Sequence, residues 1–398
     1  MADSLWIIGV AMTKFMRYKD KDLIDLGSEA ATAALADAGL TIFDADILAA
    51  GCLYDTNGIG QRLQKQIGQT GIPVYNVTNA CATGATAFRV AAMAIKAGEA
   101  SIGLAVGLEQ MGKLGLLGAQ PASKDKPYQP SGRYGAVGPV EGILGTNLMP
   151  GTFAQSGMEY AYQHDGVGFE QFAKVAEKNH AHSTLNPLAQ YQKAFSLEEV
   201  MSAEMIAYPN TLLMCCPTGD GAAAAVLCSG ERLASMPGVI RRRAVKVSAS
   251  VMTSDPYVDG GSVQFDVNTL TRQAADKAYE EAGVGPEDLD LVELHDCFAT
   301  AELRHYDNLR LCPEGGAGEW IDRRGPWRDG ETPVNVSGGL LSKGHPLGAT
   351  GIANIYEVST HLRGEAGDRQ VDGAKVGLTH VIGLGSACAV HILEKSAA

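Results

Sequence analysis

Four residues of this 398-residue chain carry side chains suited to nucleophilic and acid–base chemistry: Cys81, His295, Cys297 and His345. Cys81 lies where an apolar run over 72–77 changes into an alanine-rich helical pattern over 85–97. A sulfur at the start of a helix lies near free N–H groups and the positive end of the helix dipole, which favour the thiolate. Because the thiolate is the nucleophilic form of cysteine, we predict that Cys81 is a covalent nucleophile. The alternative is a buried cysteine that packs as a small hydrophobic residue.

The other three residues lie in two motifs. His295-Asp296-Cys297-Phe298 directly follows the apolar run 291–294, and ionisable residues at the carboxyl end of a strand are typical of sites in open α/β sheets. His345 lies in the glycine-rich segment 337–348, where glycines allow close approach of the backbone to a ligand. A third motif, Gly383-Leu384-Gly385-Ser386, follows a strand-like run and can donate backbone N–H groups. Each motif alone is more often structural, but together with Cys81 they indicate one site.

The chain also repeats itself. Asn76-Val77 and Ala82-Thr83-Gly84 recur as Asn335-Val336 and Ala349-Thr350-Gly351, each pair followed by a helical pattern. The segments 37–47 and 281–291 also match each other. In this alignment Gly348, which lies shortly after His345, corresponds to Cys81. If the two copies pack with pseudo-two-fold symmetry, both helix starts point into one cleft, with a thiol from one copy and an imidazole from the other.

Alternating strand and helix patterns predict mainly parallel sheets covered by helices, in a layered α/β/α/β/α body. We expect two pseudo-symmetric halves, 1–240 and 241–398. The segment 112–210 is looser and rich in Gly, Pro, Tyr and Gln, and its later part, 169–201, has helical patterns. We interpret it as a loop domain inserted into the first half, of the kind that forms lids, binding loops or oligomer contacts.

The composition excludes several classes of function. A formal net charge of −13 disfavours nucleic acid and anionic membranes as partners. Eight cysteines without a secretory signal predict reduced thiols, and their spacing along the chain predicts no metal site. No apolar stretch reaches the ~18 residues of a membrane span, and no signal peptide begins the chain, so we expect a cytoplasmic protein.

These motifs together resemble those of the thiolase superfamily, and most of all the sterol-carrier-protein-2-type thiolases. The resemblance runs nearly end to end, without a sterol-carrier domain, through the segments 9–15, 79–84, 178–183, 215–223, 295–298, 311–315, 338–351 and 362–367. It implies the five-layered thiolase fold and a coenzyme A-dependent acyltransferase. Such an enzyme cleaves a 3-ketoacyl-CoA with CoA, or runs the reverse Claisen condensation, through an acyl-cysteine.

The resemblance also implies a role for each residue. Cys81 would carry the acyl group, and His345 would take its proton and hydrogen-bond the thioester oxygen. His295 would stand where other thiolases keep an asparagine that orients an oxyanion-binding water. Cys297 would be the acid/base, because Val381 occupies the place of the acid/base cysteine of those enzymes. The backbone N–H groups of Cys81 and Gly383 would form the second oxyanion hole.

Substrate contacts are less defined by the resemblance. Ser248, Ser250 and Met149 are candidates for binding the acyl-CoA, with coenzyme A as a cosubstrate and no permanently bound cofactor. The family implies a homodimer or homotetramer. Two alternatives remain open: a carbon–carbon lyase that makes a retro-aldol cut in a CoA-linked steroid side chain together with a small accessory protein, and a non-catalytic acyl-CoA- or lipid-binding protein. Neither needs Cys81, His345 and Cys297 together.

Overall fold

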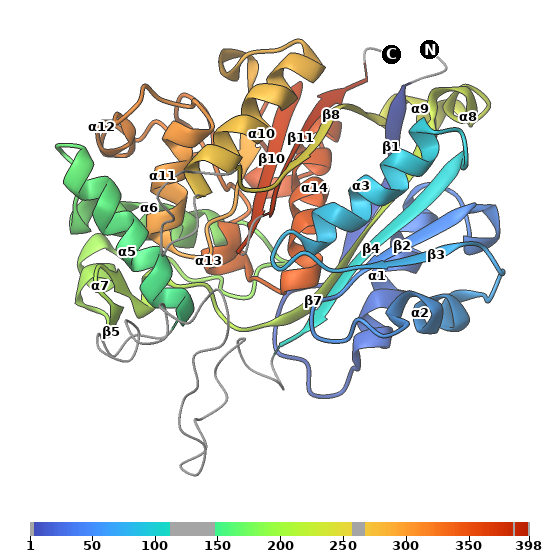
Figure 1. Cartoon of the computed structure of the whole chain (residues 1–398), viewed down its shortest axis with the longest axis horizontal. Helices are drawn as coiled ribbons and strands as arrows, with labels where there is room; N and C mark the ends of the chain where they lie inside the picture. Colours follow the sequence, from blue (N-terminus) through green and yellow to red (C-terminus); the bar gives the residue numbers. More distant parts are fainter. Residues whose placement is uncertain (1–3, 112–147, 257–266, 385–386, 397–398) are drawn as a thin grey trace.

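A mixed α/β architecture emerges from the computed structural model, which describes residues 4–111, 148–256, 267–384 and 387–396. Over these ranges a nine-stranded sheet has the order β3-β2-β4-β7-β1-β8-β11-β10-β9, and β5 and β6 form a separate pair (Figure 1). The strands are β1 (Leu5–Met12), β2 (Ile47–Gly51), β3 (Val74–Val77), β4 (Ile102–Gln110), β5 (Met205–Ala207), β6 (Asn210–Thr211), β7 (Asp220–Ser229), β8 (Val245–Thr253), β9 (Leu291–Glu293), β10 (Val376–Gly383) and β11 (Ala387–Lys395).

Helices cover and separate the two parts of this sheet. They are α1 (Leu23–Asp37), α2 (Ile59–Ile67), α3 (Thr83–Lys96), α5 (Leu148–Gln163), α6 (Phe169–Ser183), α7 (Leu197–Ser202), α8 (Gly230–Ala234), α9 (Gly238–Arg243), α10 (Val267–Ala282), α11 (Ala299–Asn308), α12 (Ala317–Asp322), α13 (Gly339–Lys343) and α14 (Leu347–Arg363). The helix–glycine–strand units predicted from both repeats are present, because α1 and α10 are each followed by a left-handed glycine, Gly39 and Gly283.

The strand order repeats about the middle of the sheet. Read from each edge of the sheet toward its middle, one part has the order β3-β2-β4-β7-β1 and the other has the order β9-β10-β11-β8. An isolated parallel bridge between Val292 and Val334 gives the second part a counterpart of β3. In the described part of the chain, strands of the two parts pair with each other only between β1 and β8, from Leu5↔Val247 to Ile7↔Val245. The repeat seen in the sequence is therefore a repeat of topology, and the boundary at 240 stays a prediction.

Five layers follow from the packing of the helices. Helix α1 packs on β7, β1 and β4, while α10 packs on β8 and β11. Between the two parts of the sheet lie α3 and α14, which contact each other and strands of both parts (Figure 1). Separate apolar cores lie between the layers, with large ones around Leu26 and Val106, around Phe88 and Ile355, and around Leu378 and Leu303. The predicted α/β/α/β/α layering is confirmed.

The expectation of mainly parallel strands is wrong. Within the described residues, three of the eight pairings in the large sheet are parallel, all involving β2 or β9. The other five are antiparallel. Helical crossovers make β2, β3 and β4 parallel. By contrast, β7 pairs antiparallel with β4, and β11 follows β10 directly and pairs antiparallel with it. Alternation of patterns along a chain does not reveal such returns.

The inserted segment lies over one end of the molecule. Its residues 112–147 are outside the described residues, and from 148 onward it forms α5, α6, α7, β5 and β6. The helices predicted within 169–201 correspond to α6 and α7. Both α5 and α6 pack against α11, the helix that follows the His295 motif. The insertion thus covers the part of the second half that carries candidate site residues.

Within the described ranges, every helix is too short or too polar to span a membrane.

The layers depend on a close crossing of α3 and α14 at their first turns. A Cβ atom on Gly84 would lie 2.6 Å from the carbonyl oxygen of Gly348. One on Gly351 would overlap the amide nitrogen of Ala85, and one on Gly107 would overlap the same Gly348 oxygen. Backbone thus meets backbone at this crossing, which leaves no room for a side chain.

We therefore expect Gly84→Ala to lower the free energy of unfolding by about 1–3 kcal/mol, the usual effect of overpacking a core. Gly238→Ala is the matched control, because its Cβ would meet only the flexible ends of Arg241 and Arg242, at 3.3 Å or more. Urea denaturation of both variants measures the difference. Equal stability of Gly84→Ala and the wild type would contradict the required close crossing.

Candidate active site

Cys81 lies on a strained turn between β3 and α3. The residue before it, Ala80, has φ of +48°, which non-glycine residues rarely adopt. Thr83 fixes this turn, because its hydroxyl donates to the carbonyl oxygen of Ala80 at 2.6 Å and accepts the N–H of Asn79 at 2.8 Å. The sulfur is thus held just ahead of the first turn of α3, as the sequence predicted.

His345 lies on the equivalent turn of the second half, between α13 and α14. Its Nδ1 is 2.8 Å from the hydroxyl oxygen of Thr350, and that hydroxyl lies 2.9 Å from the carbonyl oxygen of Pro346. Since a carbonyl can only accept, the hydroxyl proton goes to Pro346 and Nδ1 of His345 is the donor to Thr350. The lone pair of His345 is therefore on Nε2, which has no partner within the described residues.

The loop after β9 presents His295. Asp296 anchors this loop, because its carboxylate accepts the backbone N–H groups of Leu340 (2.7 Å) and Leu341 (3.2 Å) in the first turn of α13. The His295 and His345 rings form an edge-to-face pair with centroids 5.3 Å apart. Both ring nitrogens of His295 are buried without a hydrogen-bond partner among the described residues. Such orphaned nitrogens in a polar cluster are typical of a ligand site.

The three turns bring their functional atoms into one small space. Sγ of Cys81 and ring nitrogens of His295 and His345 all lie within 4.8 Å of one another. The exposed fraction of each side chain is 3% or less. A thiol from one half and two imidazoles from the other therefore share a single buried point. The repeat predicted the approach of Cys81 and His345, and His295 joins them from the loop after β9.

Burial keeps this cluster uncharged. It raises the pKa of the Cys81 thiol to about 12, against a smaller opposing effect of a hydrogen bond from the Leu384 backbone. It lowers the pKa of His295 to about 3 and holds that of His345 well below its ordinary value. The expectation that the helix start would favour the Cys81 thiolate is therefore wrong for the ligand-free protein, because loss of solvation outweighs the helix terminus.

Cys297 lies beside this cluster but is not one of the three groups within 4.8 Å of one another. Burial raises its pKa well above the ordinary value, and the neighbouring thiols of Cys216 and Cys81 act in the same direction. The backbone N–H of Cys216 donates to the carbonyl oxygen of Cys297 at 3.0 Å. Cys216, which is partly buried, is thus a third thiol near the site, and no sequence motif indicated a chemical role for it.

Gly383 ends β10 against the turn of Cys81. A Cβ atom at this position would overlap the carbonyl oxygen of Asn79, so only glycine allows the approach. The last two residues of the motif, 385 and 386, are outside the described residues. The backbone N–H groups expected to form the second oxyanion hole, those of Cys81 and Gly383, therefore belong to two segments in direct contact.

The three weaker binding candidates have different surroundings. Ser250 is buried on β8, and its hydroxyl accepts a hydrogen bond from Arg89 of α3 at 3.3 Å. Ser248 lies on the same strand, and neither serine belongs to the Cys81 cluster. Met149 of α5 packs against the core that contains Cys297 and Phe298. A role of any of the three in substrate binding stays a prediction.

Phe153, also on α5, was not singled out from the sequence. Its ring stacks on Phe298 with centroids 5.1 Å apart and lies 6.3 Å from the ring of His295. It forms an apolar wall beside the imidazole. No motif marks this residue, because α5 belongs to the inserted segment, whose pattern has no match elsewhere in the chain.

One thiol and two imidazoles are also ligands that zinc prefers, and Cys81, His295 and His345 are the described residues that could hold a metal ion. Spacing along the chain does not reveal this set, because its members come from three distant turns. The expectation that no metal is required stays a prediction, and metal analysis of the purified protein tests it.

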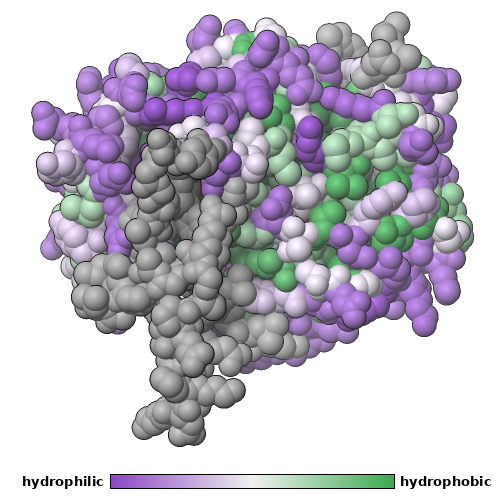
Figure 2. Space-filling view, viewed as in Figure 1, coloured by the Kyte–Doolittle hydropathy of each residue, from purple (hydrophilic) through white to green (hydrophobic). Residues whose placement is uncertain are grey.

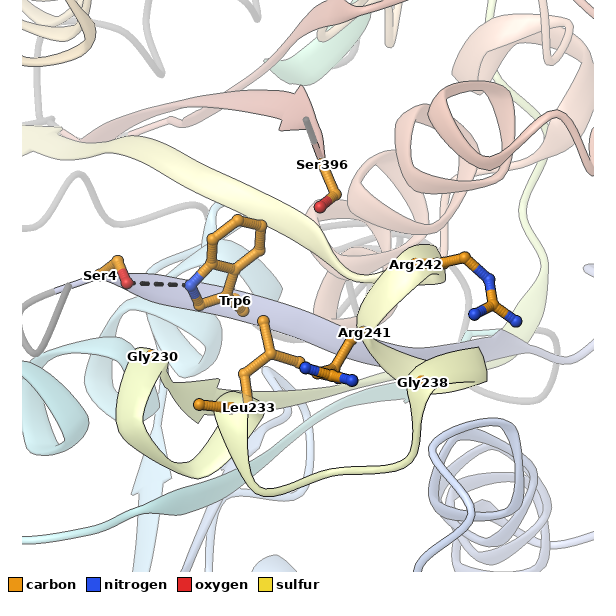
Figure 3. Close-up of a pocket in the computed structure, with 9 residues that line it drawn as sticks. Ser4, Trp6, Gly230, Leu233, Gly238, Arg241, Arg242 and Ser396 are labelled. Carbon is orange, nitrogen blue, oxygen red and sulfur yellow. Dashed lines mark hydrogen bonds between the residues drawn. The ribbon is translucent and has the colours of Figure 1, made fainter. Parts of the chain in front are cut away.

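A separate cavity of about 390 Å³ lies at the start of β1, next to α8 and α9. It is lined by Trp6 and Leu233, with Arg241 and Arg242 beside them (Figure 3). Trp6 is at the start of β1 and pairs with Cys228, which also pairs with Ile102 at the amino end of β4. Cys81 instead follows the carboxyl end of β3, which runs parallel to β4 through β2. This cavity is therefore not part of the catalytic cluster.

Comparison with known proteins assigns the family. The family model described as "Thiolase, N-terminal domain" matches residues 5–193, and "Thiolase C-terminal domain-like" matches 264–395. The chain belongs to the thiolase family. Sterol carrier protein 2 of Rattus norvegicus is 40% identical over 393 residues, covering 97% of this chain and 71% of the relative. Acetyl-CoA acetyltransferase of Methanothermobacter thermautotrophicus is 36% identical over 403 residues, covering 98% and 99%.

Solved structures agree with this assignment of the fold. The Ltp2-ChsH2(DUF35) aldolase has a TM-score of 0.81 at 22% identity and covers 100% of this chain and 99% of that chain. Human mitochondrial 3-ketoacyl-CoA thiolase in complex with CoA has a TM-score of 0.72 at 17% identity and covers 99% of each chain. The resemblance and the thiolase fold expected from the sequence are confirmed, and this thiolase is an acyltransferase.

The raised pKa of Cys81 predicts how its labelling depends on pH. Below a pKa of about 12 the thiol holds its proton, so the reactive fraction is small at neutral pH and grows as pH rises. The rate of Cys81 alkylation by iodoacetamide should increase about tenfold per pH unit from pH 7 to 10, without levelling near 9. Peptide mass spectrometry measures this rate, and unfolded protein is the control, where labelling levels near pH 9. Fast labelling that is independent of pH from pH 7 would contradict the account.

Proposed function

We propose that this thiolase cleaves a 3-ketoacyl-CoA with coenzyme A, or forms one by the reverse Claisen condensation, through an acyl group on Cys81. The observation that carries the proposal is the convergence of the Cys81 sulfur with ring nitrogens of His295 and His345 within 4.8 Å. A soft nucleophile, a base and an oxyanion partner are the groups that this reaction needs at one point.

In the first half-reaction the sulfur of Cys81 attacks the 3-keto carbon while its proton moves to Nε2 of His345. The C2–C3 bond breaks, and its electron pair forms the enolate of the departing acetyl-CoA. The thioester oxygen of this enolate accepts hydrogen bonds from the protonated His345 and from His295. Cys297 then gives its thiol proton to C2, which completes acetyl-CoA and leaves an acyl group on Cys81 and a thiolate on Cys297.

In the second half-reaction the Cys297 thiolate takes the thiol proton of coenzyme A. The CoA sulfur attacks the carbonyl carbon of the acyl group. The backbone N–H groups of Cys81 and Gly383 stabilise the negative charge that develops on the carbonyl oxygen. The carbon–sulfur bond to Cys81 breaks, and the proton held by His345 returns to the cysteine. Atoms and protons then balance, and both directions use the same groups.

The neutral resting state supports this sequence of proton transfers. Because the thiol of Cys81 and the imidazole of His345 are both uncharged, attack and proton transfer occur together, and charge develops only when substrate is present. The tautomer set by Thr350 leaves Nε2 of His345 free to accept that proton. Once protonated, the same nitrogen becomes a donor for the enolate oxygen.

The lyase alternative is supported less well. The aldolase shares the fold at 22% identity, a likeness of architecture alone. A retro-aldol cut needs no cysteine nucleophile, whereas Cys81 lies within 4.8 Å of both imidazoles. The small accessory protein and the steroid substrate belong to that alternative, and both stay predictions. The cytoplasmic location also stays a prediction.

A homodimer is the assembly that the exposed surface favours. Among the described residues strand β3 ends the sheet order and has no strand partner on its outer edge, and Tyr75 on this strand is 52% exposed. Hydrophobic surface extends over the side of the molecule where α3 and β3 lie, including Met93, which is 47% exposed (Figure 2). We propose that a second copy covers this edge, which the molecular mass in solution tests.

The acyl-enzyme is the direct test of the proposed function. After mixing with acetoacetyl-CoA, intact-mass spectrometry should show an acetyl adduct on the wild type that free CoA removes. Cys81→Ala should show none. Cys297→Ala should still become acetylated by acetyl-CoA, but more slowly, because the departing CoA thiolate no longer receives the Cys297 proton. It should fail to cleave acetoacetyl-CoA, because C2 of the enolate then lacks its acid. His345→Ala should be acetylated about 10²- to 10⁴-fold more slowly, the usual contribution of a positioned base.

The lyase and binding alternatives predict a different result. Either would give no adduct with acetoacetyl-CoA or with longer 3-ketoacyl-CoAs, and Cys81→Ala would bind these substrates as the wild type does. Absence of the adduct in correctly folded wild-type protein would overturn the proposed function.

A further inference from the structure

We propose that His380 is a positioning residue for His295: it holds the backbone of the His295 turn through a side-chain hydrogen bond that replaces the missing rung of the sheet. The inference rests on the proposed function, in which His295 is a partner of the enolate oxygen. His380 lies on β10, next to β9 in the sheet, and belongs to none of the sequence motifs that indicated the site.

The end of β9 creates the need for this contact. Regular pairing of β9 with β10 stops at Glu293 opposite Thr379. The next residues along the chain turn out of the sheet toward the cluster, so their backbone N–H groups lose their ladder partners. A buried N–H group without a partner is costly, and side chains supply the acceptors here.

Side chains on opposite sides of the turn accept the two N–H groups that have lost their ladder partners. The N–H of Leu294 donates to Oδ1 of Asn335 at 2.8 Å, from the segment beyond β9. The N–H of His295 donates to Nδ1 of His380 at 3.4 Å, from the strand on the other side. Asn335 has φ of +52°, a strained conformation typical of positions that serve a site. The turn is thus clamped between two side chains.

His380 itself is buried against α11. Its ring packs against that of His305 on α11, with centroids 4.5 Å apart, and its exposed fraction is 1%. Because Nδ1 of His380 accepts, the ring proton is on Nε2. The neighbouring residue, Val381, packs in the core that contains Cys81, so His380 points to the opposite face of the sheet. It therefore acts on the reaction only through His295.

The clamp matters for one half-reaction only. His295 has no other polar contact on its ring within the described residues, so its orientation depends on its backbone and on packing against Phe153. A shift of this ring would weaken the hydrogen bond to the enolate oxygen. Acylation of Cys81 by acetyl-CoA uses His345 and the Gly383 N–H instead. Loss of the clamp should therefore slow carbon–carbon bond cleavage while acylation continues.

Three variants test the inference. His380→Leu removes the acceptor, whereas His380→Asn restores one, because Oδ1 of asparagine occupies nearly the position of Nδ1. His391→Leu is the matched control, since His391 is an equally buried histidine on the neighbouring strand β11 and packs against Phe88. For each protein we would measure acetoacetyl-CoA cleavage, the rate of Cys81 acetylation by acetyl-CoA, and amide hydrogen exchange of the 291–298 peptide.

The inference predicts that His380→Leu lowers the cleavage rate about 10- to 100-fold, the effect of a misplaced catalytic group, while acetylation changes less than about threefold. Exchange at the 295 amide should accelerate in His380→Leu and stay slow in His380→Asn and His391→Leu. Equal losses of cleavage and acetylation, or slow amide exchange in His380→Leu, would overturn it. If the wild type is not acetylated at all, the proposed function fails, and the exchange measurement still decides the clamp.

Discussion

The contact on which the rest of the structure depends is the crossing of α3 and α14 at their first turns. At Gly84 and Gly351 the two helix backbones approach too closely for any side chain. Because each helix begins directly after a turn that carries a functional residue, this crossing sets Cys81 and His345 side by side. The pseudo-two-fold arrangement of the sheet, the layering and the apolar cores together hold these two helix starts against each other.

The same crossing determines the electrostatics of the site. Two helices packed backbone to backbone exclude water from the space between their ends, so the cost of desolvation exceeds the attraction of the helix termini for a charge. The thiols and imidazoles are consequently neutral at rest. A site of this kind stores no reactive thiolate, and its reactivity depends on correct placement of proton donors and acceptors. The hydrogen bond between His345 and Thr350 serves this placement, because it fixes which nitrogen of the imidazole accepts the proton.

Much of this arrangement could be predicted from the sequence, because the repeat carries it. The paired Asn-Val and Ala-Thr-Gly segments indicated that Cys81 and His345 belong to equivalent turns, and the two threonines, Thr83 and Thr350, tie those turns in similar ways. The charge state of Cys81 was predicted wrongly, since a helix start is visible in sequence and burial is not. Strand direction was also wrong, because direct returns such as β10 to β11 leave no periodic signal.

Other parts of the site had no local signal. Phe153 comes from the inserted segment, and His380 comes from a strand whose apolar pattern gives a histidine no special meaning. Their contributions arise only when distant segments are placed side by side in three dimensions. Sequence thus indicated the reacting groups, which lie in motifs, and could not indicate the residues that orient them, which lie in ordinary elements.

The central claim is that both imidazoles face the thioester oxygen while Cys81 faces the keto carbon. A crystal structure of Cys81→Ala with bound acetoacetyl-CoA tests it most directly. The account predicts the thioester oxygen within hydrogen-bond distance of ring nitrogens of both His295 and His345, and the 3-keto carbon next to the alanine methyl group. A substrate bound with its thioester oxygen away from both histidines, or with the keto carbon remote from residue 81, would contradict it.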